Sequence, residues 1–97
     1  MTKLIKIVKS KKALKKYDAH FRLSPSGREK VVSFGQAGAA DYTTHGDAER
    51  KERYLRRHRA RENWENPLTA GALSRWILWN HKTLEASIRA FKRKFKI

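Results

Sequence analysis

Hydrophobic and polar residues alternate in the first third of the chain, and this alternation is typical of β-strands. Every second residue over 17–23 is apolar, so these side chains would share one face of a strand. Residues 24–27 indicate a turn, because their Pro presets one backbone dihedral and their Gly permits positive φ. A second apolar run over 28–34 completes the pattern of an antiparallel β-hairpin. Residues 3–9 mix Leu, Ile and Val with lysines, and they predict either a third strand or a flexible basic arm.

Helical signals fill the second half of the chain. Thr44 is expected to cap a first helix that ends near Glu62, and its few apolar residues predict a helix lying on the surface. Asn66 would cap a second helix with Pro67 in its first position, and Thr83 would cap a third. The third helix carries an apolar stripe spaced by four, three and four residues, made of Leu84, Ile88, Phe91 and Phe95.

These patterns together predict an α+β fold. An N-terminal antiparallel β-hairpin of two or three strands would be followed by three α-helices, of which the last two form an antiparallel pair. Residues 1–16 would be a basic arm or an edge strand, and residues 17–97 a single α+β domain, because a chain of 97 residues can bury one modest core.

Charge adds the clearest functional signal. The chain carries 24 Lys+Arg against 9 Asp+Glu, a formal net charge of +15. Repulsion among fixed positive charges opposes the compact state, so a polyanionic partner is expected to compensate it. The basic residues gather in three segments, at 1–16, 50–61 and 89–97. Such blocks are typical of proteins that bind nucleic acid or another anionic surface.

The candidate nucleic-acid contacts are therefore the basic residues of these three segments. Arginine can bind a phosphate through two parallel hydrogen bonds, whereas contacts to phosphates carry no base information, so low sequence specificity is expected. The alternative is a solvated helix face that Glu49 and Glu52 partly neutralise. The candidates are Lys11, Lys12, Lys15, Lys16, Arg50, Arg53, Arg56, Arg57, Arg59, Arg61, Arg89, Lys92, Arg93, Lys94 and Lys96.

The sequence offers little for catalysis. It has no cysteine, which excludes disulfides, thiolate zinc sites and cysteine nucleophiles. His58 and Glu62 could share a metal ion, but two ligands make a poor site and the neighbouring arginines repel a cation. No nucleophile elbow or suggestive carboxylate pair occurs. We therefore expect no enzyme activity, no metal, no cofactor and no small-molecule substrate.

Aromatic and apolar residues leave two further alternatives. Trp64, Trp76 and Trp79 could stack on unpaired bases, although core packing is the better interpretation for all three, and Trp79 is the one whose exposure would be informative. The third helix resembles an interfacial helix that could bind an anionic membrane, but a chain this small needs its apolar stripe for the core. No apolar run approaches the roughly 18–20 residues that span a bilayer.

Several short blocks resemble a family of small basic proteins encoded by large DNA viruses of eukaryotes, the nucleocytoplasmic large DNA viruses. The resemblance covers roughly residues 15–95 and is strongest in the blocks DYTTHGD and TAGALSRWILWN, at 41–47 and 69–80. Further matching positions are Phe34, Gly35, Arg50, Tyr54, Arg57, His58, Glu62, Trp64 and Pro67. The resemblance implies a viral origin and a location in the virion or in the infected host cell, in cytoplasm or nucleus. It implies no activity and no catalytic residues.

Two functional hypotheses follow. The first is a non-enzymatic protein that binds nucleic acid, with DNA favoured, through its phosphate backbone and is associated with the virion or the genome. The second is a minor capsid or scaffold protein that contacts other viral capsid or core proteins through Trp79 and neighbouring apolar residues. An exposed Trp79 would favour the second hypothesis, and a buried Trp79 beside one continuous basic face would favour the first.

Overall fold

A three-stranded antiparallel sheet forms the start of the computed structural model, which describes residues 2–97. Its strands are β1 (Lys3–Lys9), β2 (Lys15–Arg22) and β3 (Glu29–Gln36), in the order β1-β2-β3. Tyr17 pairs with Phe34 across the predicted hairpin, which is confirmed. Residues 3–9 form the third strand, at one edge of the sheet.

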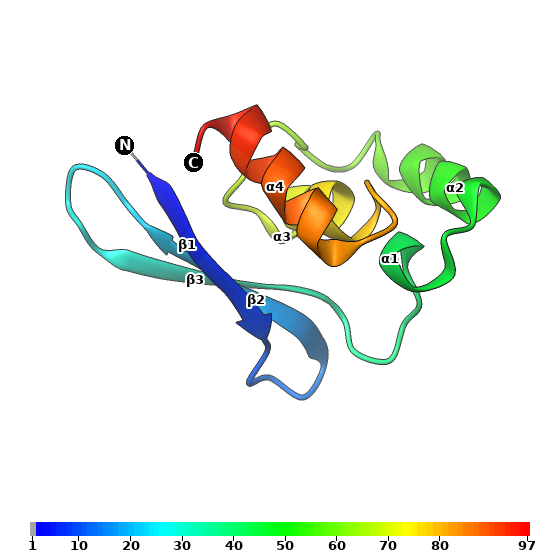
Figure 1. Cartoon of the computed structure of the whole chain (residues 1–97), viewed down its shortest axis with the longest axis horizontal. Helices are drawn as coiled ribbons and strands as arrows, with labels where there is room; N and C mark the ends of the chain where they lie inside the picture. The colour runs from blue at the N-terminus through cyan, green and yellow to red at the C-terminus, as the bar shows by residue number, and fades with distance from the viewer. Residues whose placement is uncertain (1) are drawn as a thin grey trace.

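Helices follow the sheet and cover one of its faces, so the predicted α+β fold is confirmed (Figure 1). Within residues 2–97 they are α1 (Tyr42–His45), α2 (Ala48–His58), α3 (Ala70–Leu73), the π-helical turn η1 (Ser74–Leu78) and α4 (Leu84–Phe95). The prediction of three α-helices is wrong, because four form in this part of the chain. Whether the last two predicted helices form an antiparallel pair stays a prediction.

The unexpected helix α1 arises from a capping box. The Asp41 side chain accepts a hydrogen bond from the Thr43 backbone N–H, and the Thr44 hydroxyl accepts one from the Asp41 backbone N–H. Gly46 then ends the turn in the left-handed conformation, with φ of 62°, which favours glycine. Thr44 therefore lies inside α1, and the prediction that it caps the first long helix is wrong.

Three other predicted helix boundaries can be compared with the structure. Asp47 caps α2, which ends at His58 rather than near Glu62. The side chain of Asn66 accepts a hydrogen bond from the Leu68 N–H in a turn before α3, so Asn66 is not a helix cap. Thr69 provides the cap of α3 instead. The prediction that Thr83 caps the last helix is confirmed.

The hydrophobic core lies between the sheet and the helices that cover it. Alternate residues of β2 point toward the helices, which explains why Ala19 and Phe21 are fully buried. Burying a Phe or Leu side chain contributes about 1.5–3 kcal/mol, so this cluster is the main source of stability. Its buried members are Leu4, Ala19, Phe21, Phe34, Leu73, Ile77, Leu78 and Phe91.

The opposite face of the sheet is open, and α2 stands apart from the sheet. Figure 1 shows α2 at one end of the long axis, with the β2–β3 turn at the other end. The molecule measures 41 Å along this axis. No helix within residues 2–97 combines the length and the apolar character that crossing a membrane would require. The fold thus presents its most arginine-rich helix at one end of the molecule.

Candidate nucleic-acid interface

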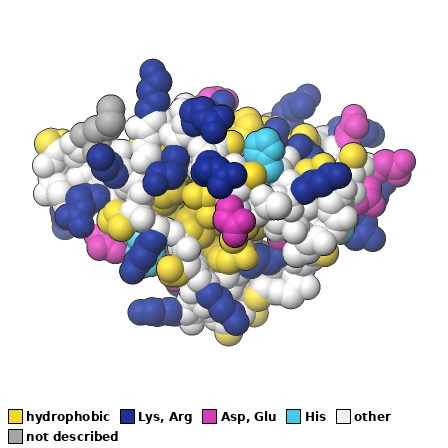
Figure 2. Space-filling model, in the orientation of Figure 1, with side chains coloured by type: hydrophobic (Ala, Val, Ile, Leu, Met, Phe, Trp, Pro, Cys, Tyr) yellow, Lys and Arg dark blue, Asp and Glu magenta, His cyan; other side chains and the backbone are white. Residues whose placement is uncertain are grey.

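The three basic segments lie at different places around the molecule. In Figure 1, α2 is at one end, the turn between β1 and β2 is at the lower edge, and the end of α4 is at the upper edge. Lys and Arg side chains are spread over the face in Figure 2 rather than gathered in one patch. Charges that are segregated in the sequence are therefore distributed in space.

Helix α2 carries the densest group of arginines. The Asp47 side chain accepts hydrogen bonds from the backbone N–H groups of Arg50 and Glu49, which fix the start of the helix. The bond from the Arg50 N–H is the largest of the effects that lower the pKa of this carboxyl. Arg50, Arg53 and Arg57 follow at spacings of three and four, so they lie on one side of α2 and all are exposed.

Two arginines of this side have no acidic partner. Arg50 Nε lies 3.7 Å from Asp47 Oδ2, and Arg56 Nη2 on another side of the helix lies 3.9 Å from Glu52 Oε1. Both of these pairs are exposed, and such pairs contribute little. Arg53 and Arg57 form no ion pair within residues 2–97. Their guanidinium groups are free to bind a phosphate.

The lysines around the β1–β2 turn divide into two groups. Lys11, Lys12 and Lys15 are exposed. Lys16 instead forms an ion pair with Asp41, which is 2% exposed, and also donates to the Ala39 carbonyl. This ion pair joins the start of β2 to the cap of α1. Lys16 therefore has a structural contact that the sequence did not reveal, whereas the other three lysines remain candidates.

Basic residues near the end of α4 are also exposed, but one of them, Lys94, already contacts other side chains. Lys94 Nζ lies 4.5 Å from the centre of the Trp76 ring and 3.6 Å from Glu65 Oε2, so it already has two favourable contacts. Arg59 and Arg61, which follow α2, are exposed as well. The remaining exposed candidates on α4 and just beyond it are Arg89, Lys92, Arg93 and Lys96.

Aromatic stacking holds α2 against the rest of the protein. Tyr54 is its one buried residue, and the Tyr54 ring stacks on Trp79 with centroids 4.5 Å apart and planes 5° apart. On the next turn of α2, the His58 ring stacks on Tyr54 at 4.3 Å. Lys51 Nζ adds a hydrogen bond of 2.7 Å to the Asn80 carbonyl. Trp79 is thus half-buried in a stack and does not form the exposed patch that would have favoured a capsid or scaffold protein.

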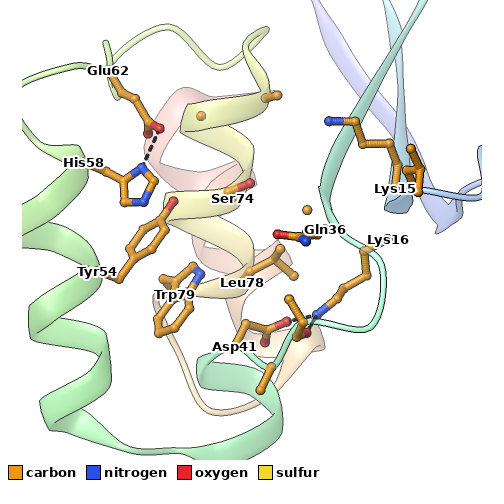
Figure 3. Close-up of a pocket in the computed structure, with 16 residues that line it drawn as sticks. Lys15, Lys16, Gln36, Asp41, Tyr54, His58, Glu62, Ser74, Leu78 and Trp79 are labelled. Carbon is orange, nitrogen blue, oxygen red and sulfur yellow. Dashed lines mark hydrogen bonds and ion pairs between the residues drawn. The ribbon is translucent and has the colours of Figure 1, made fainter.

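A cleft of about 600 Å³ lies between α2 and the end of the sheet at which β2 begins and β3 ends (Figure 3). Helices α3 and η1 form its floor. Lys15 and Gln36 line one wall, and Tyr54 and His58 line the other. Glycine and alanine residues in the lining have little or no side chain to fill the cleft. Four of these small residues are Gly35, Ala40, Ala70 and Gly71.

His58 and Glu62, which the sequence identified as a weak metal pair, are hydrogen-bonded to each other. His58 Nδ1 lies 2.9 Å from Glu62 Oε1, and Trp64 Nε1 donates to Glu62 Oε2 at 2.9 Å. Across residues 2–97, no group of three or more His, Cys, Asp or Glu side chains is placed to hold a metal ion. The carboxylate therefore orients the imidazole at the rim of the cleft.

Sequence reasoning did not identify this cleft. Its walls come from β2, β3, α2 and η1, which are distant in sequence, and no local spacing pattern connects them. One local signal was present, because His58 and Glu62 lie four residues apart, but this spacing suggested only a metal pair, which the neighbouring arginines disfavour, and it gave no sign of a cleft.

Comparison with known proteins gives one family match. The profile of a family described as "Family of unknown function (DUF5754)" matches residues 5–58. This segment includes nearly all of the sheet, α1 and α2, and it is more than half of the chain. No curated protein and no solved structure matches the chain. The geometry of the candidate interface is therefore the main guide to what it binds.

Proposed function

The chain belongs to the family of unknown function DUF5754, and from its own surface we propose that it is a non-enzymatic protein that binds the phosphate backbone of nucleic acid, with DNA favoured. The observation that carries this proposal is the exposed side of α2, where Arg53 and Arg57 have no acidic partner within residues 2–97. The net charge of +15 supports it, because a polyanion would relieve the repulsion among the positive charges.

The geometry of α2 suits contact with a phosphate backbone. Arg53 and Arg57 are separated by about 6 Å along the helix axis, at a rise of about 1.5 Å per residue. Long side chains on one helix side can therefore bind neighbouring phosphates of the same strand. Each guanidinium can donate two parallel hydrogen bonds to phosphate oxygens. Since these contacts do not read base edges, binding is expected to depend little on sequence.

The basic segments lie apart instead of forming the one continuous face named above as favouring nucleic-acid binding, and this separation fits a protein that packs nucleic acid. The segments that carry these basic residues, α2, the β1–β2 turn and the end of α4, lie at different places around the molecule (Figure 1). One molecule could then contact more than one nucleic-acid segment. Together with the resemblance to proteins of large DNA viruses, this favours association with a viral genome, in the virion or the infected cell.

Paired substitutions on α2 test this assignment against a matched control. Arg53→Gln with Arg57→Gln removes two free guanidinium groups, and Arg22→Gln with Arg28→Gln removes the same charge near the β2–β3 turn at the opposite end of the molecule. The log–log salt slope of duplex binding falls by about 0.9 for each phosphate that the protein no longer neutralises. We expect the slope to fall by about 1.8 in the α2 variant, which loses two phosphate contacts. In the control variant it should fall by less than half of that value.

Equal effects of the two double variants would contradict the assignment to α2. Far-ultraviolet circular dichroism and thermal melting are the controls that test whether both variants are folded. Because all four arginines are exposed, neither double substitution disturbs the core.

The second candidate is a minor capsid or scaffold protein, and the open face of the sheet favours it. Val8 and Val31 flank the middle of β2 on this face and are 38% and 48% exposed. They lie opposite Asp18 and His20 of β2, so a protein partner on this face would contact apolar and polar side chains together. If Val8→Ser with Val31→Ser abolished capture of viral coat proteins and left DNA binding unchanged, this candidate would be supported.

A further inference from the structure

A column of aromatic rings runs along the α2 side of the cleft, and three of its members, Tyr54, His58 and Trp79, line the cleft. Trp79 and His58 lie 4.5 Å and 4.3 Å from the Tyr54 ring centroid, with planes 5° and 26° from it. Two rings cannot share one face of Tyr54 at these distances, so they occupy opposite faces. His45 lies 5.4 Å from Trp79. His58 is therefore a terminal ring of the stack, and its side chain is 41% exposed.

The orientation of His58 is fixed by its surroundings. Glu62 accepts at one oxygen from Trp64 and contacts the His58 imidazole at the other. A Cβ at Gly71 would lie 2.8 Å from a Glu62 carboxylate oxygen, so the glycine makes room for this carboxylate. A ring held in place in advance loses little conformational entropy when a ligand stacks on it.

Several polar groups with unused hydrogen-bonding capacity face the same cleft. Within residues 2–97, no protein group hydrogen-bonds to the side chains of Lys15, Gln36, Tyr54 or Ser74, all of which line it. Figure 3 shows Lys15 and Gln36 across the cleft from Tyr54 and His58. The Tyr54 hydroxyl is protonated at neutral pH and can donate a hydrogen bond, and burial, together with the nearby Glu62 carboxylate, raises its pKa further.

These observations describe a ligand that is planar, carries hydrogen-bonding edges and is joined to an anion. We propose that the cleft holds an unpaired nucleobase that stacks on the free face of His58, with its edge toward Gln36 and its phosphate toward Lys15. A volume of about 600 Å³ lies in the usual range of ligand pockets. Bases released from a duplex commonly stack on aromatic side chains, including His.

This inference rests on the proposed function and adds a preference for nucleic acid with unpaired bases. A base inside a continuous duplex is stacked and paired, so it cannot enter a cleft of this kind. Bulges, overhangs and single strands supply such a base. Arg53 and Arg57 would bind the backbone, and the cleft would select the unpaired position.

The test compares two probes of identical duplex sequence, one blunt and one with a single-stranded 3′ overhang that contains 2-aminopurine. The protein is expected to bind the overhang probe about tenfold more tightly, which is the size of one base–aromatic stack, and to quench the 2-aminopurine fluorescence. His58→Ala should remove the preference and the quenching. His58→Phe should keep both, because it retains an aromatic face.

Gln36→Ala provides a second variant that does not disturb the aromatic column, since Gln36 is exposed. It should lower the preference severalfold while binding of the blunt duplex stays constant. Equal affinity for both probes without quenching would overturn the cleft assignment and leave backbone binding intact. Failure to bind either probe would overturn the proposed function as well.

Free 2-aminopurine ribonucleoside monophosphate distinguishes the two sources of the ligand. If the protein quenches the overhang probe at concentrations at which it does not quench the free nucleotide, the cleft binds a base that is part of a nucleic-acid strand. Quenching of the free nucleotide with no preference for the overhang would overturn the assignment to a bound strand.

Discussion

Asp18 shows how one buried polar side chain organises a turn. It lies on the open face of the sheet and is 7% exposed. Its carboxylate accepts hydrogen bonds from the hydroxyls of Ser33 at 2.6 Å and Ser10 at 2.7 Å, and from the Lys11 N–H at 3.4 Å. These bonds, led by that of Ser33, lower the pKa of Asp18. One carboxylate thus joins β2 to β3 and to the β1–β2 turn.

The substitution Asp18→Asn should destabilise the protein by about 1–3 kcal/mol at pH 7, the usual cost of disrupting hydrogen bonds to a buried group. Because the pKa of Asp18 is lower in the folded state, its ionisation stabilises the fold above the unfolded pKa of about 4. This contribution disappears as the pH falls through the folded pKa. Urea unfolding at pH 7 and pH 3 measures the free energy of unfolding of the wild type and of the variant. If the difference between the two proteins is as large at pH 3 as at pH 7, this account of Asp18 is excluded.

Gly35 is required both by its backbone conformation and by its neighbours. Its φ is 78°, and an added Cβ would lie 2.9 Å from Leu78 Cδ1 and 3.0 Å from Lys16 Cβ. Gly38 has a φ of 80° but open space around its Cα. Gly35→Ala should therefore lower the free energy of unfolding by more than Gly38→Ala, whose cost is limited to backbone strain of about 1–3 kcal/mol. Thermal melting of both variants tests this, and equal decreases in melting temperature would show that the proximity of Leu78 is unimportant.

At the scale of elements, alternation and turn chemistry predicted the hairpin, and an apolar stripe with a threonine cap predicted α4. These features depend on neighbours in sequence. Helix α1 was missed because four residues carry no periodicity, and its Asp41 box was mistaken for a cap at Thr44. The π-helical turn was missed because the bond from Trp79 N–H to the Ser74 carbonyl leaves no sequence pattern.

The candidate site was predictable only in part, for a related reason. The exposure expected for the arginines of α2 follows from the thin apolar face of the helix. The ion pair of Lys16 with Asp41 and the stacking of Tyr54 on Trp79 join residues 25 positions apart in sequence, and no local rule reports such contacts. Long-range packing decides which basic residues are free.

Helix α2 should be the least stable helix when its aromatic anchor is removed. Isolated helices shorter than about 12–15 residues are marginal in water, and α2 has 11 residues. Tyr54→Ala removes the ring that stacks on both Trp79 and His58. Amide hydrogen exchange in α2 should then accelerate by at least about tenfold, while amides of β2 stay protected. If protection in β2 and α2 decreased together, α2 would be part of the same cooperative unit as the sheet.

At the scale of the whole molecule, a net charge of +15 is confined to a body of 41 × 27 × 25 Å. Repulsion between these charges destabilises the folded state, and salt screens it over a Debye length of about 10 Å at 0.1 M. The melting temperature should therefore rise by several degrees between about 50 mM and 500 mM NaCl. Differential scanning calorimetry measures this shift, and a constant or falling melting temperature would show that the basic segments do not repel one another significantly.

The central claim is that this protein binds the nucleic-acid backbone without reading its sequence. Its 41 Å length corresponds to about 12 base pairs of duplex at about 3.4 Å per pair. The most direct measurement is therefore a titration of fluorescent duplexes of about 20 base pairs and unrelated sequence at several salt concentrations. The account predicts equal affinities for all sequences and a steep linear fall of log K with log salt, whose slope counts the phosphates bound. Binding that is absent at physiological salt, or that differs strongly between sequences, would contradict it.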